Sequence, residues 1–151
     1  MEQFTGTRPV SEQHGFDSAS LARWLADHVP GFDGPLAAEQ FKGGQSNPTF
    51  KLTTPRRTYV MRAKPGPAAK LLPSAHAIER VPVPEMLALC EDESVIGRAF
   101  YVMSFVEGRV LWNQALPEAT PAERGAIYDE MNRVIAALHR VDVAAAGLAD
   151  Y

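Results

Sequence analysis

Residues 43–64, GGQSNPTFKLTTPRRTYVMRAK, decide the fold. A glycine-rich segment, 43–48, leads into a β-branched and aromatic run, 49–53, and a turn leads from there into a second run, 58–64. Short runs of this kind, separated by Gly, Pro and Asn, are typical of antiparallel strands joined by tight turns. Together with a further run at 36–42, they predict three strands in succession.

The segment between the first two of these strands is a candidate phosphate-binding loop. A tight glycine turn exposes successive backbone N–H groups and lets an anion approach closely. It is not a Walker A motif, because Gly-Lys-Ser/Thr is absent. The alternative is a hairpin that only turns the chain. The residues of this candidate loop are Gly43, Gly44, Gln45, Ser46 and Asn47.

Two cations follow the loop on the third strand. Side chains alternate between the faces of a strand, so Val60, Arg62 and Lys64 share one face. A cation on the strand after a glycine loop can reach phosphates held under that loop. The alternative is that the alternating charges mark a solvated face of the strand.

Outward from this centre, the sequence predicts helices and further strands. Residues 1–16 show no period and predict a flexible leader. Asp17 or Ser18 can cap a helix that ends at Pro30 and Gly31.

Residues 86–90 and 99–106 are strand candidates, and the second run ends abruptly at Glu107-Gly108. Such a junction can offer backbone groups and an apolar wall to a planar ligand, or it can be a core strand leaving the sheet.

The clearest helix starts at Thr120-Pro121-Ala122-Glu123, where a capping box coincides with a proline at the first helical position. Apolar residues then recur at helical spacing from Ile127 to Leu138, and Gly147 predicts the end of the helix.

Composition limits the class of protein. The chain has 151 residues, of which 46% are hydrophobic and 22% charged, and its formal net charge is −3. These values indicate a globular, cytoplasmic protein, with neither nucleic acid nor a membrane as partner. The single cysteine, Cys90, excludes a cysteine-based zinc cluster, and its apolar strand favours a buried, inert thiol.

In their order along the chain, these segments resemble the aminoglycoside phosphotransferase/choline kinase family, and within it the domain found fused to acyl-CoA dehydrogenases. The matching segments are 43–50, 59–65, 71–80, 81–84, 87–92, 100–103, 107–109 and the helix ending in Leu138-His139.

The resemblance implies an α+β, protein-kinase-like fold. Residues 17–106 would form the N-terminal lobe, an antiparallel five-stranded sheet with a shortened helix. Residues 107–151 would be the hinge linker and the first helices of a truncated C-terminal lobe. ATP would lie between the lobes, and the γ-phosphoryl group of MgATP would pass to a hydroxyl of a small molecule.

The resemblance also implies roles for individual residues. Residues 43–47 would be the phosphate loop, and Arg62 the counterpart of the third-strand lysine on the phosphates, with Lys64 as the fallback. The hinge beside adenine would be Ser104, Phe105 and Val106.

Two departures from the family pattern concern the catalytic machinery. Val81 follows Arg80 directly, which indicates an internal deletion that leaves Glu79 as an imperfect substitute for the family's helix glutamate. His-Gly-Asp followed by Asn is absent, so the sequence offers no catalytic residues and no magnesium ligands.

Two hypotheses follow from these departures. The chain is part of an ATP-dependent phosphotransferase with an unknown acceptor, or it is a non-catalytic remnant that binds nucleotide or proteins. Apolar surface left uncovered by a missing lobe would favour self-association.

Overall fold

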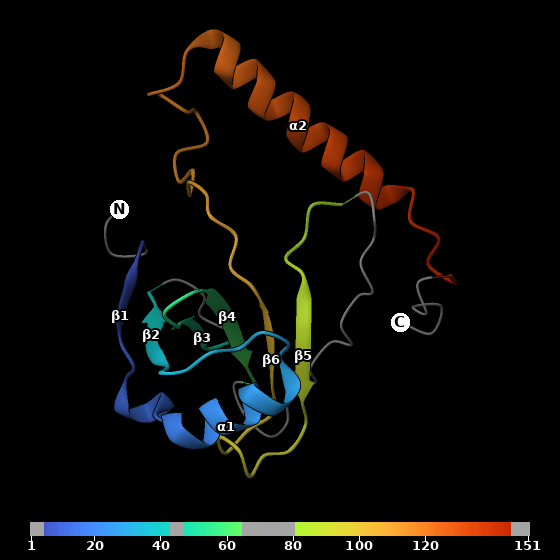
Figure 1. The fold of residues 1–151 in the computed structure, drawn as a ribbon. Helices are drawn as coiled ribbons and strands as arrows, with labels where there is room; N and C mark the ends of the chain where they lie inside the picture. Colours follow the sequence, from blue (N-terminus) through green and yellow to red (C-terminus); the bar gives the residue numbers. More distant parts are fainter. Residues whose placement is uncertain (1–4, 43–46, 65–80, 146–151) are drawn as a thin grey trace. The chain divides into compact units, whose positions relative to one another are not determined.

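The computed structural model describes residues 5–42, 47–64 and 81–145. They divide into two compact units. The sheet unit contains the described residues up to Lys64 together with Pro84–Glu107, and the helical unit contains residues 81–83 and 108–145. Figure 1 labels the elements of both units.

The sheet has six strands, all antiparallel to their neighbours, in the order β1-β2-β3-β4-β6-β5. Because β6 pairs with both β4 and β5, the last two strands lie in the reverse of their chain order (Figure 1). The strands are β1 Thr7–Pro9, β2 Ala37–Phe41, β3 Thr49–Thr53, β4 Thr58–Ala63, β5 Met86–Cys90 and β6 Phe100–Ser104.

The sheet has one strand more than the five that the sequence predicted. The additional strand, β1, lies within residues 1–16, where the sequence predicted a leader without regular structure, and a 3₁₀ turn follows at Glu12–His14. A three-residue strand is too short to show alternation, and its place depends on the edge of β2. The Thr7 hydroxyl donates to Glu39 on β2 at 2.8 Å, which fixes this pairing.

Helix α1, Ser18–His28, packs on one face of the sheet. Asp17 is its N-cap and accepts a hydrogen bond from the backbone N–H of Ala19 at 2.9 Å. Its apolar side contributes Leu21 and Leu25 to the core. The core residues on the strands are Phe50, Leu52, Tyr59, Met61, Ala63, Cys90, Phe100 and Val102.

Helix α2, Pro121–His139, begins where the sequence predicted. The Thr120 side chain accepts from the backbone N–H of Glu123, and the Glu123 carboxylate accepts from the backbone N–H of Thr120, which completes the capping box. The predicted end at Gly147 is wrong, because α2 ends at His139. Just beyond it, the Asp142 carboxylate accepts from the backbone N–H groups of Ala144 and Ala145, so these groups serve a separate turn.

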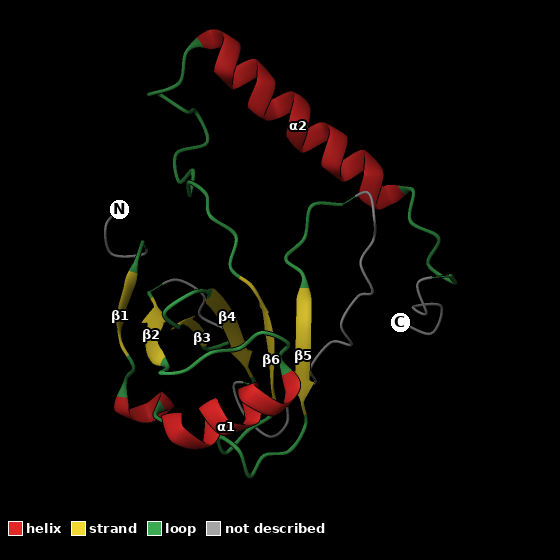
Figure 2. Ribbon diagram, viewed as in Figure 1, coloured by secondary structure: helices red, strands yellow, loops and turns green. Residues whose placement is uncertain are grey.

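The segment from Gly108 to Thr120 contains no helix or strand (Figure 2). Two side chains of α2 hold it. The Arg124 guanidinium donates to the carbonyls of Leu116 and Ala119 at 3.2 and 2.6 Å, and the Tyr128 hydroxyl donates to the carbonyl of Gln114 at 2.7 Å.

Within the described ranges, no helix has both the length and the apolar character required to cross a membrane. The short helical piece predicted over residues 75–80 lies outside the described residues, as does Glu79.

Candidate functional site

The sheet has a second face, opposite α1, and the predicted cation Arg62 lies on it. Alternation along the strands puts Phe50, Tyr59 and Phe100 on the face toward α1, so their sequence neighbours point the other way. We call this surface the second face. On the three central strands it consists of Thr49 and Lys51 from β3, Val60 and Arg62 from β4, and Tyr101 and Met103 from β6.

Arg62 lies at the centre of the second face. It is directly opposite Thr49 on one side and Tyr101 on the other. Its Nε is buried and has no hydrogen-bond partner among the described residues. A buried donor without an acceptor costs about 1–3 kcal/mol, and more when the group is charged. The Arg62 Nε–H is therefore an unsatisfied donor on the second face, as far as the described residues show.

Lys64, the predicted fallback, follows the end of β4. Its backbone N–H donates to the carbonyl of Ala99 at 2.9 Å, which continues the extended chain past Ala63. With alternation maintained, Lys64 lies on the same face as Arg62, one residue pair further along. The structure thus places Val60 and Arg62 on one face of β4, as predicted, while Lys64 lies just beyond the last residue of the strand.

Lys51 belongs to this face and was missed by the sequence reasoning. It is directly opposite Val60, and its ammonium nitrogen lies 5.5 Å from the centre of the Phe105 ring. A cation at this distance from an aromatic ring is in attractive contact with it. The alternation of buried Phe50 and Leu52 in β3 was the signal available, since it turns Lys51 to the opposite face.

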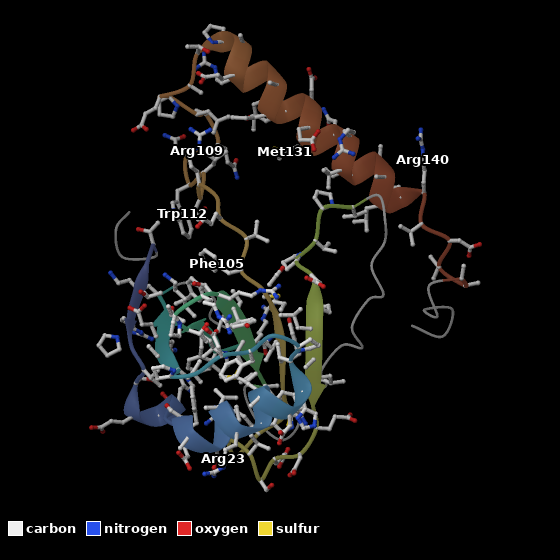
Figure 3. All side chains as sticks on the ribbon, in the orientation of Figure 1. Arg23, Phe105, Arg109, Trp112, Met131 and Arg140 are labelled. Atoms are coloured by element: carbon white, nitrogen blue, oxygen red, sulfur yellow. The ribbon has the colours of Figure 1, made fainter. Side chains whose placement is uncertain are left out.

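The predicted hinge residues have different surroundings. Phe105, labelled in Figure 3, continues the second face beyond β6. Its ring contacts the Lys51 ammonium group. The Ser104 hydroxyl accepts from the backbone N–H of Glu85 at 2.9 Å, and the Ser104 N–H donates to the Glu85 carbonyl, so this residue extends the β5–β6 pairing. Val106 is 63% exposed.

Most of the predicted phosphate loop lies outside the described residues, namely Gly43, Gly44, Gln45 and Ser46. Its last residue, Asn47, is described, and its carbonyl accepts from the Thr49 hydroxyl at 3.1 Å. The backbone N–H of Ala63 donates to the Pro48 carbonyl at 3.0 Å. The end of the loop is therefore attached to β4 next to Arg62.

Other candidates for chemistry are engaged in the fold. The Cys90 thiol is buried, and this burial raises its pKa, which agrees with the prediction of an inert thiol. Among the described residues, no three His, Cys, Asp or Glu side chains lie together in an arrangement that could hold a metal ion.

Comparison with known proteins decides the family. Residues 37–151 match the phosphotransferase enzyme family. The chain belongs to this family. A solved structure from Ralstonia eutropha, described as a candidate aminoglycoside phosphotransferase, is 61% identical to this phosphotransferase-family chain, with a TM-score of 0.75. The match covers 91% of this chain and 42% of that one. The predicted α+β fold, with a kinase-like N-terminal lobe, is confirmed.

Curated relatives of this family member are acyl-CoA dehydrogenase family proteins. Family member 11 of Gallus gallus is 44% identical over 163 residues, which is 97% of this chain and 20% of that protein. Family member 11 of Rattus norvegicus is 40% identical over 167 residues, which is 100% of this chain and 21% of that protein. The chain spans about a fifth of the length of these curated relatives.

The lengths of these matches differ from the length of this phosphotransferase-family chain. The rat match runs over 167 residues and this chain has 151, so at least 16 residues of the relative have no counterpart here. An internal deletion produces a difference in this direction. The deletion predicted after Arg80 falls at the edge of the residues that the structure leaves undescribed.

Proposed function

We propose that this chain is the nucleotide-binding part of an ATP-dependent small-molecule phosphotransferase. The observation that supports this best is the buried Nε of Arg62, which has no acceptor among the described residues. Phosphate oxygens fit the planar donors of a guanidinium group and form strong charge-assisted hydrogen bonds with it. In this proposal Arg62 binds the phosphates together with Lys64 and the predicted phosphate loop, residues 43–47.

Adenine fits the apolar part of the same face. Val60 and Met103 are cross-strand neighbours, and Phe105 follows two residues after Met103. An apolar wall next to the end of a strand suits a planar ligand. Within the hinge Ser104–Val106, we assign the side-chain contact to Phe105, because the Ser104 hydroxyl is bonded to Glu85.

Magnesium, which the family implies, does not fit the described donor set. Nucleotide-bound Mg²⁺ usually takes one or two protein carboxylates, whereas the cross-strand neighbours of Arg62 are Thr49 and Tyr101. No three His, Cys, Asp or Glu side chains are grouped among the described residues either. The 151 residues also contain no His-Gly-Asp sequence. We therefore propose that these residues bind the nucleotide, while transfer to the hydroxyl of an acceptor needs a base and metal ligands from further residues.

A second function, protein interaction, is favoured by α2. None of its 19 residues is buried, and Met131, Ile135 and Leu138 are about half exposed. Together with Pro82, Ile127 and Met131 line an open apolar hollow of about 470 Å³ within the helical unit. We propose that this surface drives self-association, and sedimentation at high concentration tests it. A single monomeric species at all concentrations would exclude self-association.

Calorimetry with MgATP tests the nucleotide proposal. We expect binding by the unaltered chain and a loss of affinity of at least about tenfold in Arg62→Ala, because a charge-assisted hydrogen bond is removed. Arg23→Ala on α1, on the other side of the sheet, is the matched control and should bind as the unaltered chain does (Figure 3). Equal affinity of Arg62→Ala and the unaltered chain would refute the role given to Arg62.

A further inference from the structure

The second face is positively charged although the chain as a whole is negative. Its three charged residues on β3 and β4, including the residue that follows β4, are Lys51, Arg62 and Lys64, and the formal net charge of the chain is −3. Diagonal cross-strand neighbours such as Lys51 and Arg62 lie about 7–8 Å apart at the backbone. The distance is shorter than the Debye length of about 8 Å to 10 Å in physiological salt, so these charges act on one ligand together.

None of these three cations forms an ion pair among the described residues. The ion pairs there join Arg56 to Asp33, Arg57 to Glu85 and Arg133 to Glu130. Glu39 on β2 lies directly opposite Lys51, so its carboxylate, which also accepts from the Thr7 hydroxyl, offsets part of the positive charge.

The neighbours of Arg62 across the strands carry no charge. They are the hydroxyl residues Thr49 and Tyr101. The Nε of Arg62 is buried without a hydrogen-bond partner among the described residues, and neither of its cross-strand neighbours is an anion.

This donor set suits an anion more than it suits a metal-anion complex. A polyphosphate chain carries several negative charges at neutral pH, and a bound magnesium ion usually neutralises part of them. Here the side-chain cations can do so directly, and among the described residues no three His, Cys, Asp or Glu side chains are grouped so as to hold a metal ion. The second face therefore supplies the neutralisation that the family pattern assigns to metal ligands.

We infer that the second face binds the polyphosphate anion itself, through Arg62, Lys51 and Lys64, without a divalent cation. This inference rests on the proposed function in placing the phosphates at Arg62, and it adds that affinity for the nucleotide does not depend on magnesium. Inorganic tripolyphosphate, which has no adenine or ribose, is then also a ligand of this face.

The test is calorimetry with the full chain and four titrants: ATP with Mg²⁺, ATP with EDTA, tripolyphosphate with EDTA, and adenosine. We expect ATP to bind in EDTA with an affinity within about threefold of that for MgATP, and tripolyphosphate to bind in EDTA as well. Arg62→Ala should weaken tripolyphosphate binding at least about tenfold. Lys51→Ala, which removes the neighbouring cation on β3, should weaken it about threefold to tenfold and guards against misfolding of the Arg62 variant.

Three results would overturn the inference. If MgATP binds but ATP in EDTA shows no binding, the metal is needed for affinity, and the proposed function remains intact. Absence of binding by all four titrants would refute both. Equal losses of tripolyphosphate affinity in Arg23→Ala and Arg62→Ala would show that the interaction depends only on the net charge of the chain.

Discussion

Helices α1 and α2 are both capped and both carry an apolar stripe, but their stripes have different surroundings. In α1, Leu21 and Leu25 are 0% and 1% exposed against the sheet. In α2, a helix almost twice as long, no residue is buried. The cap thus marks where a helix begins in both units, whereas burial depends on a surface supplied by distant parts of the chain.

The largest expected effect is a difference in the loss of stability between substitutions in the two apolar stripes. Leu25→Ala should lower the free energy of unfolding by about 2–5 kcal/mol, because it leaves a cavity in a filled core. Leu138→Ala in α2 should change it by less than about 0.5 kcal/mol, because half of that side chain is already exposed. Urea unfolding of both variants measures the difference, and comparable losses would show that α2 is buried in solution.

The second prediction concerns the caps. Thr120→Ala removes the acceptor for the Glu123 N–H and should destabilise the start of α2 by about 1 kcal/mol. Since no buried residue holds α2, the loss should appear as local fraying, visible in the backbone chemical shifts of residues 121–125. Asp17→Ala is the counterpart in α1, where the packed leucines should keep the helical shifts unchanged. Fraying in Asp17→Ala but not in Thr120→Ala would reverse the comparison.

A smaller effect is expected inside the core of the sheet unit. The Tyr59 hydroxyl is buried and has no partner among the described residues, and burial raises its pKa. Tyr59→Phe should leave stability unchanged or raise it by about 1 kcal/mol, because an unsatisfied polar group is removed. A thermal melt measures this. A clear loss of stability would show that the hydroxyl has a partner in solution.

The smallest effect is expected from an ionic contact at the edge of the sheet unit. Hydrogen bonds from Thr54 and then Arg56 lower the pKa of Asp33, at 2.7 Å each. A carboxyl whose pKa is lower in the folded state stabilises the fold above its unfolded pKa, and this contribution is lost as pH falls through the folded pKa. Arg56 is 77% exposed, so the contribution is small.

Unfolding of the unaltered chain and of Asp33→Asn between pH 7 and pH 2 tests this contribution. The stability difference between them should shrink as the pH falls. A difference that grows toward acid pH would contradict the assignment of the contact.

Local patterns in the sequence predicted the elements well. The bounds of β3 and β5 are those predicted, and the capping box placed the start of α2. Strand β1 was missed, because three residues show no period and their pairing depends on β2. The position of β6 between β4 and β5 could not be predicted from the sequence either, because alternation of side chains does not specify a partner strand.

The candidate site was predictable in part. That Arg62 and Lys64 share one face could be predicted, because side chains alternate along an extended strand. The contribution of Lys51 required the register between β3 and β4, which places it opposite Val60, and the position of Phe105. The Ser104 hydroxyl was expected in the hinge, and its bond to Glu85 depends on a pairing between strands.

The central claim, that nucleotide binds to the second face, is tested most directly by mapping backbone amide signals during titration with ATP. The account predicts shifts that concentrate at Lys51, Val60, Arg62 and Met103, with α1 and α2 left unchanged. Shifts confined to α2, or saturable binding that leaves the amides around Arg62 unmoved, would contradict it.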